Sequence, residues 1–251
     1  MLTFSEFVIY LCIGLVSGFM SGMFGIGGGS VRIPLLNLAG LPLISAFGIN
    51  LFVIPFSSFV GALKHRENIN KNIGVYMIVG GALGSIAGAI SVGLIPNLAL
   101  AIIFAIIAIL TVFGIYLDKI APRISQALDP TPRDFILIPF FLNLITGMRG
   151  GSGGSLFPPF LKAMKQDVHK AIATSLFVTI FTSLAAMVIY WHRGNIVWLP
   201  ALCVLVGSIA GARIGSGISI KAKPFWLEIG LVVLVMVLAF SVIYKALCIR
   251  N

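Results

Sequence analysis

Residues 22–36 read GMFGIGGGSVRIPLL, and residues 147–161 read GMRGGSGGSLFPPFL. The two stretches lie 125 residues apart, are identical at eight of fifteen positions, and each follows an uncharged apolar run. Glycines leave the backbone open to a ligand and can turn amide N–H groups toward an anion. The residues that follow can begin a helix, whose first N–H groups are unpaired and partly positive. We interpret both stretches as breaks in helices that face one shared anion site.

The chain around these stretches has the composition of an integral membrane protein. Of its 251 residues, 59% are hydrophobic and 10% are charged, whereas roughly a quarter of the residues of a soluble domain are charged. A bilayer core takes about 20 residues of helix, so the uncharged run at 73–117 must hold two spans joined near residues 94–97. The other apolar runs cover residues 7–24, 46–63, 135–148, 171–191, 196–212 and 224–244. The sequence predicts an all-α, multi-pass protein with about eight transmembrane helices, the first retained rather than cleaved as a signal.

The second half of the chain repeats the first. The hexapeptide GSIAGA occurs at 84–89 and 207–212, and the pattern His-Arg-x-Asn-Ile occurs at 65–69 and 192–196. Several such matches in the same order indicate an internal duplication, as in many transporters. We therefore expect a first transmembrane repeat at 1–117, a polar linker at 118–134 and a second transmembrane repeat at 135–251.

The orientation of the two repeats depends on how often each half crosses the membrane. Four spans in each half, each half with one Gly-rich helix break, give parallel repeats. If the segments after the breaks, 31–41 and 156–164, cross as short helices, the protein has ten shorter segments arranged as inverted 5+5 repeats. The sequence leaves both arrangements open.

The formal net charge of +10 is distributed over short loops. It forms no long basic surface, so nucleic acid is not an expected partner. Contact with the lipid bilayer and attraction of a small anionic substrate account for the charge. In the eight-span arrangement, loops on the side of the termini carry more Lys and Arg, which favours cytoplasmic termini.

Two glycine loops would form the predicted anion site. The first glycine loop is residues 25–30 and the second is residues 150–155, and matched polar residues of later helices accompany them. The predicted substrate-binding residues are Gly25, Gly27, Gly28, Gly29, Ser30, Asn50, Arg149, Gly150, Gly151, Ser152, Gly153, Gly154, Ser155 and Ser175. The alternative is that both loops are surface turns. They do not form a nucleotide loop, because the GK[ST] ending is missing.

Three arginines and one acid lie in or near apolar segments. Arg149 falls inside the motif at 147–161, directly before the second loop, and is the candidate countercharge for an oxyanion. Arg32 has a weaker claim, because its long side chain can reach an interface. Arg213 is expected to reach an interface or to pair with Glu228 on the next span.

Four residues end matching helices: His65, Arg66, His192 and Arg193. Because histidine titrates near neutral pH, these pairs are candidates for a gate or a proton relay. The alternative is that they are interfacial anchors beside aromatic residues.

Residue types that carry other chemistry are scarce in this sequence. Glu228 is the acidic residue inside a span, so ion coupling through a buried carboxylate is hard to place. Cys12, Cys203 and Cys248 lack the spacing of a metal site or a disulfide framework. We expect no metal, no cofactor and no catalytic residues, and the sequence is compatible with a homo-oligomer.

The sequence resembles the sulfite exporter TauE/SafE family of membrane permeases. The resemblance rests on the motif at 22–34 and its copy at 147–159, on Ala171, Thr174 and Ser175, and on the His-Arg-x-Asn-Ile elements. It covers nearly the whole chain. It implies a secondary transporter of small sulfur oxyanions or organosulfonates, such as sulfite or sulfoacetate, often an exporter in the bacterial inner membrane. A passive anion channel and, less favoured, a membrane-embedded enzyme are the alternatives.

Overall fold

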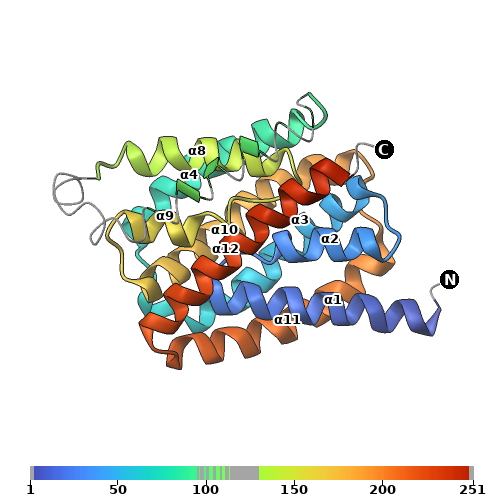
Figure 1. Ribbon diagram of the computed structural model, residues 1–251, viewed down its shortest axis with the longest axis horizontal. Helices are drawn as coiled ribbons and strands as arrows, with labels where there is room; N and C mark the ends of the chain where they lie inside the picture. The colour runs from blue at the N-terminus through green and yellow to red at the C-terminus, as the bar shows by residue number, and fades with distance from the viewer. Residues whose placement is uncertain are drawn as a thin grey trace.

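The computed structural model describes residues 3–94 and 130–248, with isolated positions between 96 and 113. The predicted hairpin at 94–97 and the linker at 118–134 fall largely outside the described residues. The described part is helical, without strands, and Figure 1 shows its helices lying side by side as one bundle. The helices are α1 (Phe4–Phe24), α2 (Gly29–Leu38), α3 (Leu43–Lys64), the short 3-10 helix η1 (Arg66–Asn68), α4 (Lys71–Ile90), α8 (Asp134–Gly147), α9 (Phe157–Ala163), α10 (Val168–His192), α11 (Trp198–Lys221) and α12 (Pro224–Cys248).

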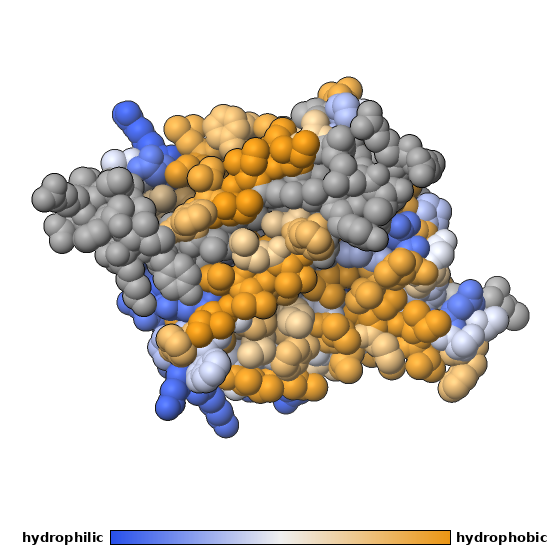
Figure 2. All heavy atoms as spheres, in the orientation of Figure 1, coloured by the Kyte–Doolittle hydropathy of each residue, from blue (hydrophilic) through white to orange (hydrophobic). Residues whose placement is uncertain are grey.

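Five of these helices are long and apolar enough to cross a membrane: α1, α3, α4, α10 and α11. The apolar helix α8 is shorter, and α12 is also apolar over Pro224–Val237. Apolar side chains cover the middle of the face seen in Figure 2, and hydrophilic residues gather toward its ends. The protein is therefore a multi-pass integral membrane protein, whereas the count of eight spans stays a prediction.

Both predicted helix breaks are present. Helix α1 ends at Phe24 and α2 begins at Gly29, while α8 ends at Gly147 and α9 begins at Phe157. Figure 1 shows that the chain reverses direction at the first break, so that α2 runs back along α1. Three of the long helices, α1, α4 and α10, begin at capping side chains, because the first N–H groups of a helix need acceptors. Asn70 accepts from the Ile73 N–H at 3.3 Å, and Asp167 accepts from the His169 N–H at 2.9 Å.

Two helix pairs are joined by stripes of small residues. Along α1, a Cβ on Gly14, Gly18 or Gly22 would meet backbone atoms of α11, and a Cβ on Gly207, Gly211 or Gly215 of α11 would meet backbone atoms of α1. Helix α4 packs on α8 in the same way through Gly80, Gly84 and Gly88. In lipid, small residues let helix backbones approach until van der Waals contact and hydrogen bonds hold them together.

Each pair joins the two halves of the chain. Gly14, Gly18 and Gly22 meet Val204, Ser208 and Ala212 in that order, so α1 and α11 run parallel. Gly80, Gly84 and Gly88 meet Ile136, Phe140 and Leu144, so α4 and α8 also run parallel. Helix α11 of the second half therefore packs on α1, the first helix of the first half, and α4 of the first half packs on α8, the first described helix of the second half.

Helices α3 and α10 pack against each other at the centre and run antiparallel. Near the start of α3, a Cβ on Gly48 would lie 2.6 Å from the carbonyl oxygen of Asn195, just beyond the end of α10. Near the end of α3, a Cβ on Gly61 would lie 3.0 Å from the side chain of Leu176, near the start of α10. These two helices carry matching sequences, so the matching elements run in opposite directions.

We expect Gly211→Val to destabilise the protein strongly, because its side chain would meet the carbonyl oxygen of Leu15 on α1. Overpacking typically costs about 1–3 kcal/mol and occasionally more, and a rigid backbone neighbour favours the upper end. The matched control is Gly217→Val on the same helix, where a Cβ has no neighbouring heavy atom within 4 Å. The melting temperature of each detergent-purified variant measures the effect, and equal melting temperatures would contradict the packing role of the stripe.

Candidate functional site

The first glycine loop turns the chain by left-handed backbone conformations. Gly25 ends α1 with φ +73°, and its N–H donates to the Ser21 carbonyl at 2.8 Å. Gly28 has φ +72°, and a Cβ there would lie 2.6 Å from the Ser17 carbonyl oxygen. Both the backbone angle and the space require glycine at position 28. The loop is thereby pressed against α1.

The second glycine loop is held at its start by Thr146. The N–H of Gly151 donates to the Thr146 carbonyl at 2.8 Å, and the N–H of Gly153 donates to the Thr146 hydroxyl at 2.8 Å. Residues 150–155 are buried or half-buried. This loop is therefore not a surface turn, and neither is the first, in which residues 25–29 are buried.

The two loops meet inside the bundle. A Cβ on Gly154 would lie 3.0 Å from the carbonyl oxygen of Ile26, and a Cβ on Gly27 would lie 3.9 Å from the Cα of Gly154. The residues beside this meeting point are Ile54 and Thr179, which lie near the midpoints of α3 and α10. The loops are therefore placed at half the height of the two central helices.

Each loop is held by a polar residue of the other half. Asn50 on α3 donates from Nδ2 to the carbonyl oxygen of Gly150 at 2.7 Å. Ser175 on α10 donates from its hydroxyl to the carbonyl oxygen of Gly25 at 2.6 Å. These two contacts are related by the shift of 125 residues that separates the sequence copies. Asn50 and Ser175 thus stand next to the loops as predicted, and they contact backbone carbonyl groups there.

Several loop N–H groups have no acceptor among the residues that the structure describes. In the first loop these are the N–H groups of residues 26–30, and in the second those of residues 152, 154 and 155. A buried backbone N–H without an acceptor is rare and costly. The Ser152 hydroxyl is also buried without a hydrogen bond within the described chain. The loops therefore concentrate unused hydrogen-bond donors where they meet.

Arg32 does not reach an interface, contrary to one expectation. Its side chain is fully buried and lies behind the first loop, with Nη2 3.1 Å from the position of a Cβ on Gly28. Its hydrogen bonds go to neutral groups: Nε to the Ser17 hydroxyl at 3.1 Å, Nη1 to Asn50 Oδ1 at 2.8 Å and Nη2 to the Ser208 hydroxyl at 2.9 Å. Within the described chain no carboxylate pairs with this cation. Its positive charge thus remains available to the loop.

Arg149 is half-buried directly before the second loop. Its N–H donates to the Thr146 carbonyl oxygen at 3.0 Å, which continues the turn after α8. The two halves carry their arginines at different positions, since Phe157 corresponds to Arg32 and Phe24 corresponds to Arg149. Both phenylalanines are buried. Each half thus contributes one arginine beside its own loop.

The four residues proposed for a gate or a proton relay lie at helix ends, away from the loops. Arg193 donates to the last carbonyl groups of α4, from Nη1 to Ala89 at 2.8 Å and from Nη2 to Ile90 at 3.3 Å. His65 is buried beside the start of α10, and burial together with nearby His169 lowers the pKa of His65 to about 4. Arg66 and His192 are exposed. A gating role for these four residues stays a prediction.

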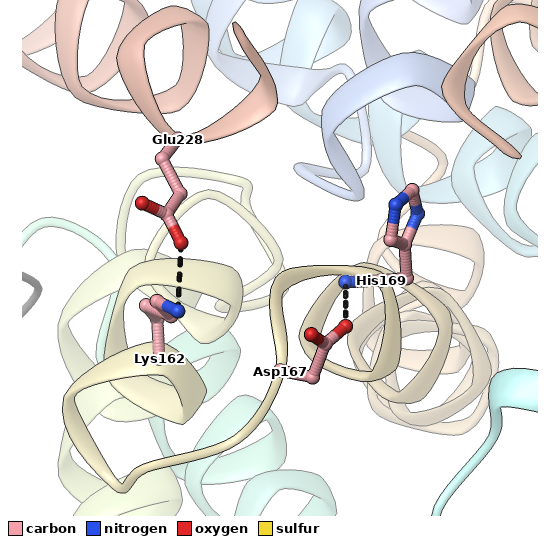
Figure 3. A network of polar contacts seen from close by, with 4 residues as sticks. All are labelled: Lys162, Asp167, His169 and Glu228. Carbon is pink, nitrogen blue, oxygen red and sulfur yellow. Dashed lines mark hydrogen bonds and ion pairs between the residues drawn. The ribbon is translucent and has the colours of Figure 1, made fainter. Parts of the chain in front are cut away.

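The pairing expected between Arg213 and Glu228 is wrong. Glu228 on α12 forms an ion pair with Lys162 on α9, with 2.7 Å between Oε1 and Nζ (Figure 3). Lys162 lies on α9, the short helix that follows the second loop, and its side chain reaches Glu228 on α12. No group of three His, Cys, Asp or Glu side chains that could hold a metal ion occurs in the described part of the chain.

Thr179 is the site residue that the sequence analysis missed. It is fully buried on α10, and its hydroxyl is 3.0 Å from the position of a Cβ on Gly154. Its methyl group is 3.2 Å from the position of a Cβ on Gly27, so the side chain touches both loops. The signal in the sequence was a threonine at the position where the first copy has Ile54.

Comparison with known proteins identifies relatives of the chain among membrane transporters. The family model for the sulfite exporter TauE/SafE matches residues 10–242. The chain is 26% identical to "Probable membrane transporter protein YunE" of Bacillus subtilis, with 96% of this chain and 99% of that protein covered. It is also 26% identical to "Probable membrane transporter protein MJ0441" of Methanocaldococcus jannaschii, with 88% and 89% covered. No solved structure matches the chain. The chain thus belongs to the sulfite exporter TauE/SafE family of membrane transporters.

Proposed function

We propose that this membrane transporter is a secondary exporter of a small anion, bound between the two glycine loops near the middle of the membrane. The observation that carries the proposal is the group of loop N–H donors without acceptors in the described chain, at the point where the loops meet. An oxyanion accepts several such hydrogen bonds at once, and a helix N-terminus such as that of α2 favours negative charge. The family name indicates a sulfur oxyanion or organosulfonate, such as sulfite or sulfoacetate.

The electrostatics of the site agree with an anionic substrate. Arg32 lies directly behind the first loop, and its neutral partners leave its charge uncompensated. Arg149 adds a second cation beside the second loop. A buried cation is costly unless a counter-ion offsets it, and a bound anion is such a counter-ion. Arg32 therefore joins Arg149 as the proposed source of positive charge.

The helix directions favour the inverted arrangement of ten shorter segments over two parallel sets of four. Antiparallel α3 and α10 carry matching sequences, and matching contacts hold the two loops. Inverted repeats around a midplane site are typical of transporters that work by alternating access. The same movement that opens one side closes the other, which a passive channel does not need. We therefore favour a carrier over a channel, and the two halves at 1–117 and 135–251 as its repeats.

The charge distribution favours an orientation opposite to the one expected from the sequence. One end of the bundle holds the end of α3, the starts of α4, α8 and α10, and the connection from α11 to α12. The Lys and Arg residues of this end are Lys64, Arg66, Lys71, Arg133, Lys165, Lys170, Lys221 and Lys223. At the other end, where α1 begins and α12 ends (Figure 1), Arg193 is the one Lys or Arg with a described side chain. Positive loops stay in the cytoplasm, so we propose that both termini face outward.

The flux test compares wild type with Gly154→Ala in proteoliposomes that contain sulfite. We expect wild type to release sulfite and Gly154→Ala to release it at least about tenfold more slowly, a barrier change of about 1.4 kcal/mol. The added methyl group would lie 3.0 Å from both Ile26 O and Thr179 Oγ1, where the anion is proposed to bind. Gly217→Ala is the control. If wild type moves neither sulfite nor a sulfonate, the proposed function is wrong.

Arg32→Gln tests the source of positive charge. We expect this variant to keep its melting temperature without anion, because an uncompensated buried cation contributes little stability. Its affinity for sulfite should fall about 10- to 100-fold, the range for a lost hydrogen bond to a charged group. Anion-dependent thermal shifts measure this loss. Wild-type affinity in Arg32→Gln would remove Arg32 from the site and leave Arg149 as the countercharge.

Single cysteines test the orientation in a variant without Cys12, Cys203 and Cys248. We expect Thr3→Cys to react with a membrane-impermeant maleimide in intact cells, and Glu67→Cys to react after the membrane is opened. Both positions are exposed and lie at opposite ends of the bundle. The reverse pattern of labelling would restore cytoplasmic termini.

A further inference from the structure

Thr179 carries a buried, unused hydroxyl; Ser21, Ser58 and Ser219 also carry one, but Thr179 lies against both glycine loops. The hydroxyl groups of Ser57, Thr146, Ser183 and Ser216 all donate to a carbonyl group of their own helix. The Thr179 hydroxyl has no hydrogen-bond partner within the described chain. An unpaired hydroxyl in an apolar interior costs about 1–3 kcal/mol. A group held at that cost beside both glycine loops is a candidate ligand group.

An apolar side chain, that of Ile54, also lies beside the point where the loops meet. Ile54 occupies the matching position on α3, is buried, and has Cγ2 3.8 Å from the position of a Cβ on Gly27. A Cβ on Gly27 would also contact the methyl group of Thr179 at 3.2 Å, so both residues lie against the point where the loops meet. The polar groups around this point are loop N–H groups, the Thr179 hydroxyl and the carbonyl oxygen of Ile26, whereas the Ile54 side chain offers no donor.

We propose, resting on the function proposed above, that Thr179 donates to the anion and that Ile54 faces a corner of the anion without an acceptor. The preferred ligand is then a pyramidal anion with three oxygens, such as sulfite or the head of a sulfonate. A tetrahedral anion with four oxygens, such as sulfate, would direct one oxygen at Ile54. A buried acceptor without a donor is costly, and such sites reject the mismatched ligand strongly.

The experiment measures the affinities of purified protein for sulfite and for sulfate, at an alkaline pH at which both are dianions. We expect wild type to bind sulfite at least about tenfold more tightly than sulfate. Thr179→Val keeps the shape and removes the hydroxyl, so it should lose about 10- to 100-fold in sulfite affinity. Thr179→Ser restores a hydroxyl and should bind sulfite nearly as well as wild type. Ile54→Thr adds a hydroxyl at the apolar position and should narrow the preference for sulfite over sulfate.

Ser183→Ala is the control, because the Ser183 hydroxyl is satisfied within α10, one turn beyond Thr179. Equal sulfite affinity in Thr179→Val and wild type, or an unchanged sulfite-to-sulfate ratio in Ile54→Thr, would overturn this inference alone. If wild type binds none of these anions, the proposed function falls together with it. A melting temperature measured without ligand identifies any variant that is misfolded. If Thr179→Val is misfolded, the test rests on the anion affinities of Thr179→Ser and Ile54→Thr.

Discussion

The hydrogen bonds from each half of the chain to the glycine loop of the other half are the constraint on which the structure depends. A backbone that leaves the helical ladder inside lipid loses its acceptors and donors and must find replacements in protein or in a wet cavity. Asn50 and Ser175 satisfy the carbonyl groups of Gly150 and Gly25. These two carbonyl groups therefore hold the loops in place, whereas several N–H groups of the loops have no acceptor in the described chain. An anion accepts hydrogen bonds and donates none when fully ionised, which matches this remainder.

Arg32 shows how a cation can be buried without a carboxylate partner in the described chain. Its three neutral partners come from α1, α3 and α11 and lie 15, 18 and 176 residues away in the sequence. Asn50 belongs both to this network and to the contact with Gly150. The charge behind the first loop is thereby connected through one side chain to the position of the second loop. Asn50 therefore both orients Arg32 and holds the second loop. A movement that separates α3 from the second loop must break the hydrogen bond between Asn50 and Gly150.

The sequence predicted the helix breaks because a cluster of glycines, repeated between two pairs of apolar runs, is incompatible with a stable uninterrupted helix. It also identified Asn50 and Ser175, since polar residues at matched positions of apolar helices are uncommon. It did not predict the burial of Arg32, whose partners converge only after distant helices pack. The pairing of Lys162 with Glu228 was missed for the same reason, because long side chains choose among neighbours set by the fold. The direction of the repeats depended on whether a ten-residue segment such as α2 runs back along α1, which its length alone does not determine.

The two halves share a backbone plan and differ in the chemistry placed on it. Arg32 of the first half corresponds to Phe157 in the second, and Ile54 of the first half corresponds to Thr179. A symmetric site between identical loops would offer equal donors on both sides and would suit a ligand of matching symmetry. These differences instead give the first half a buried cation and the second half a buried hydroxyl, while the backbone arrangement of the two halves is the same. Because alternating access needs only the backbone symmetry, the side chains around the loops are free to diverge toward a ligand whose corners are not alike.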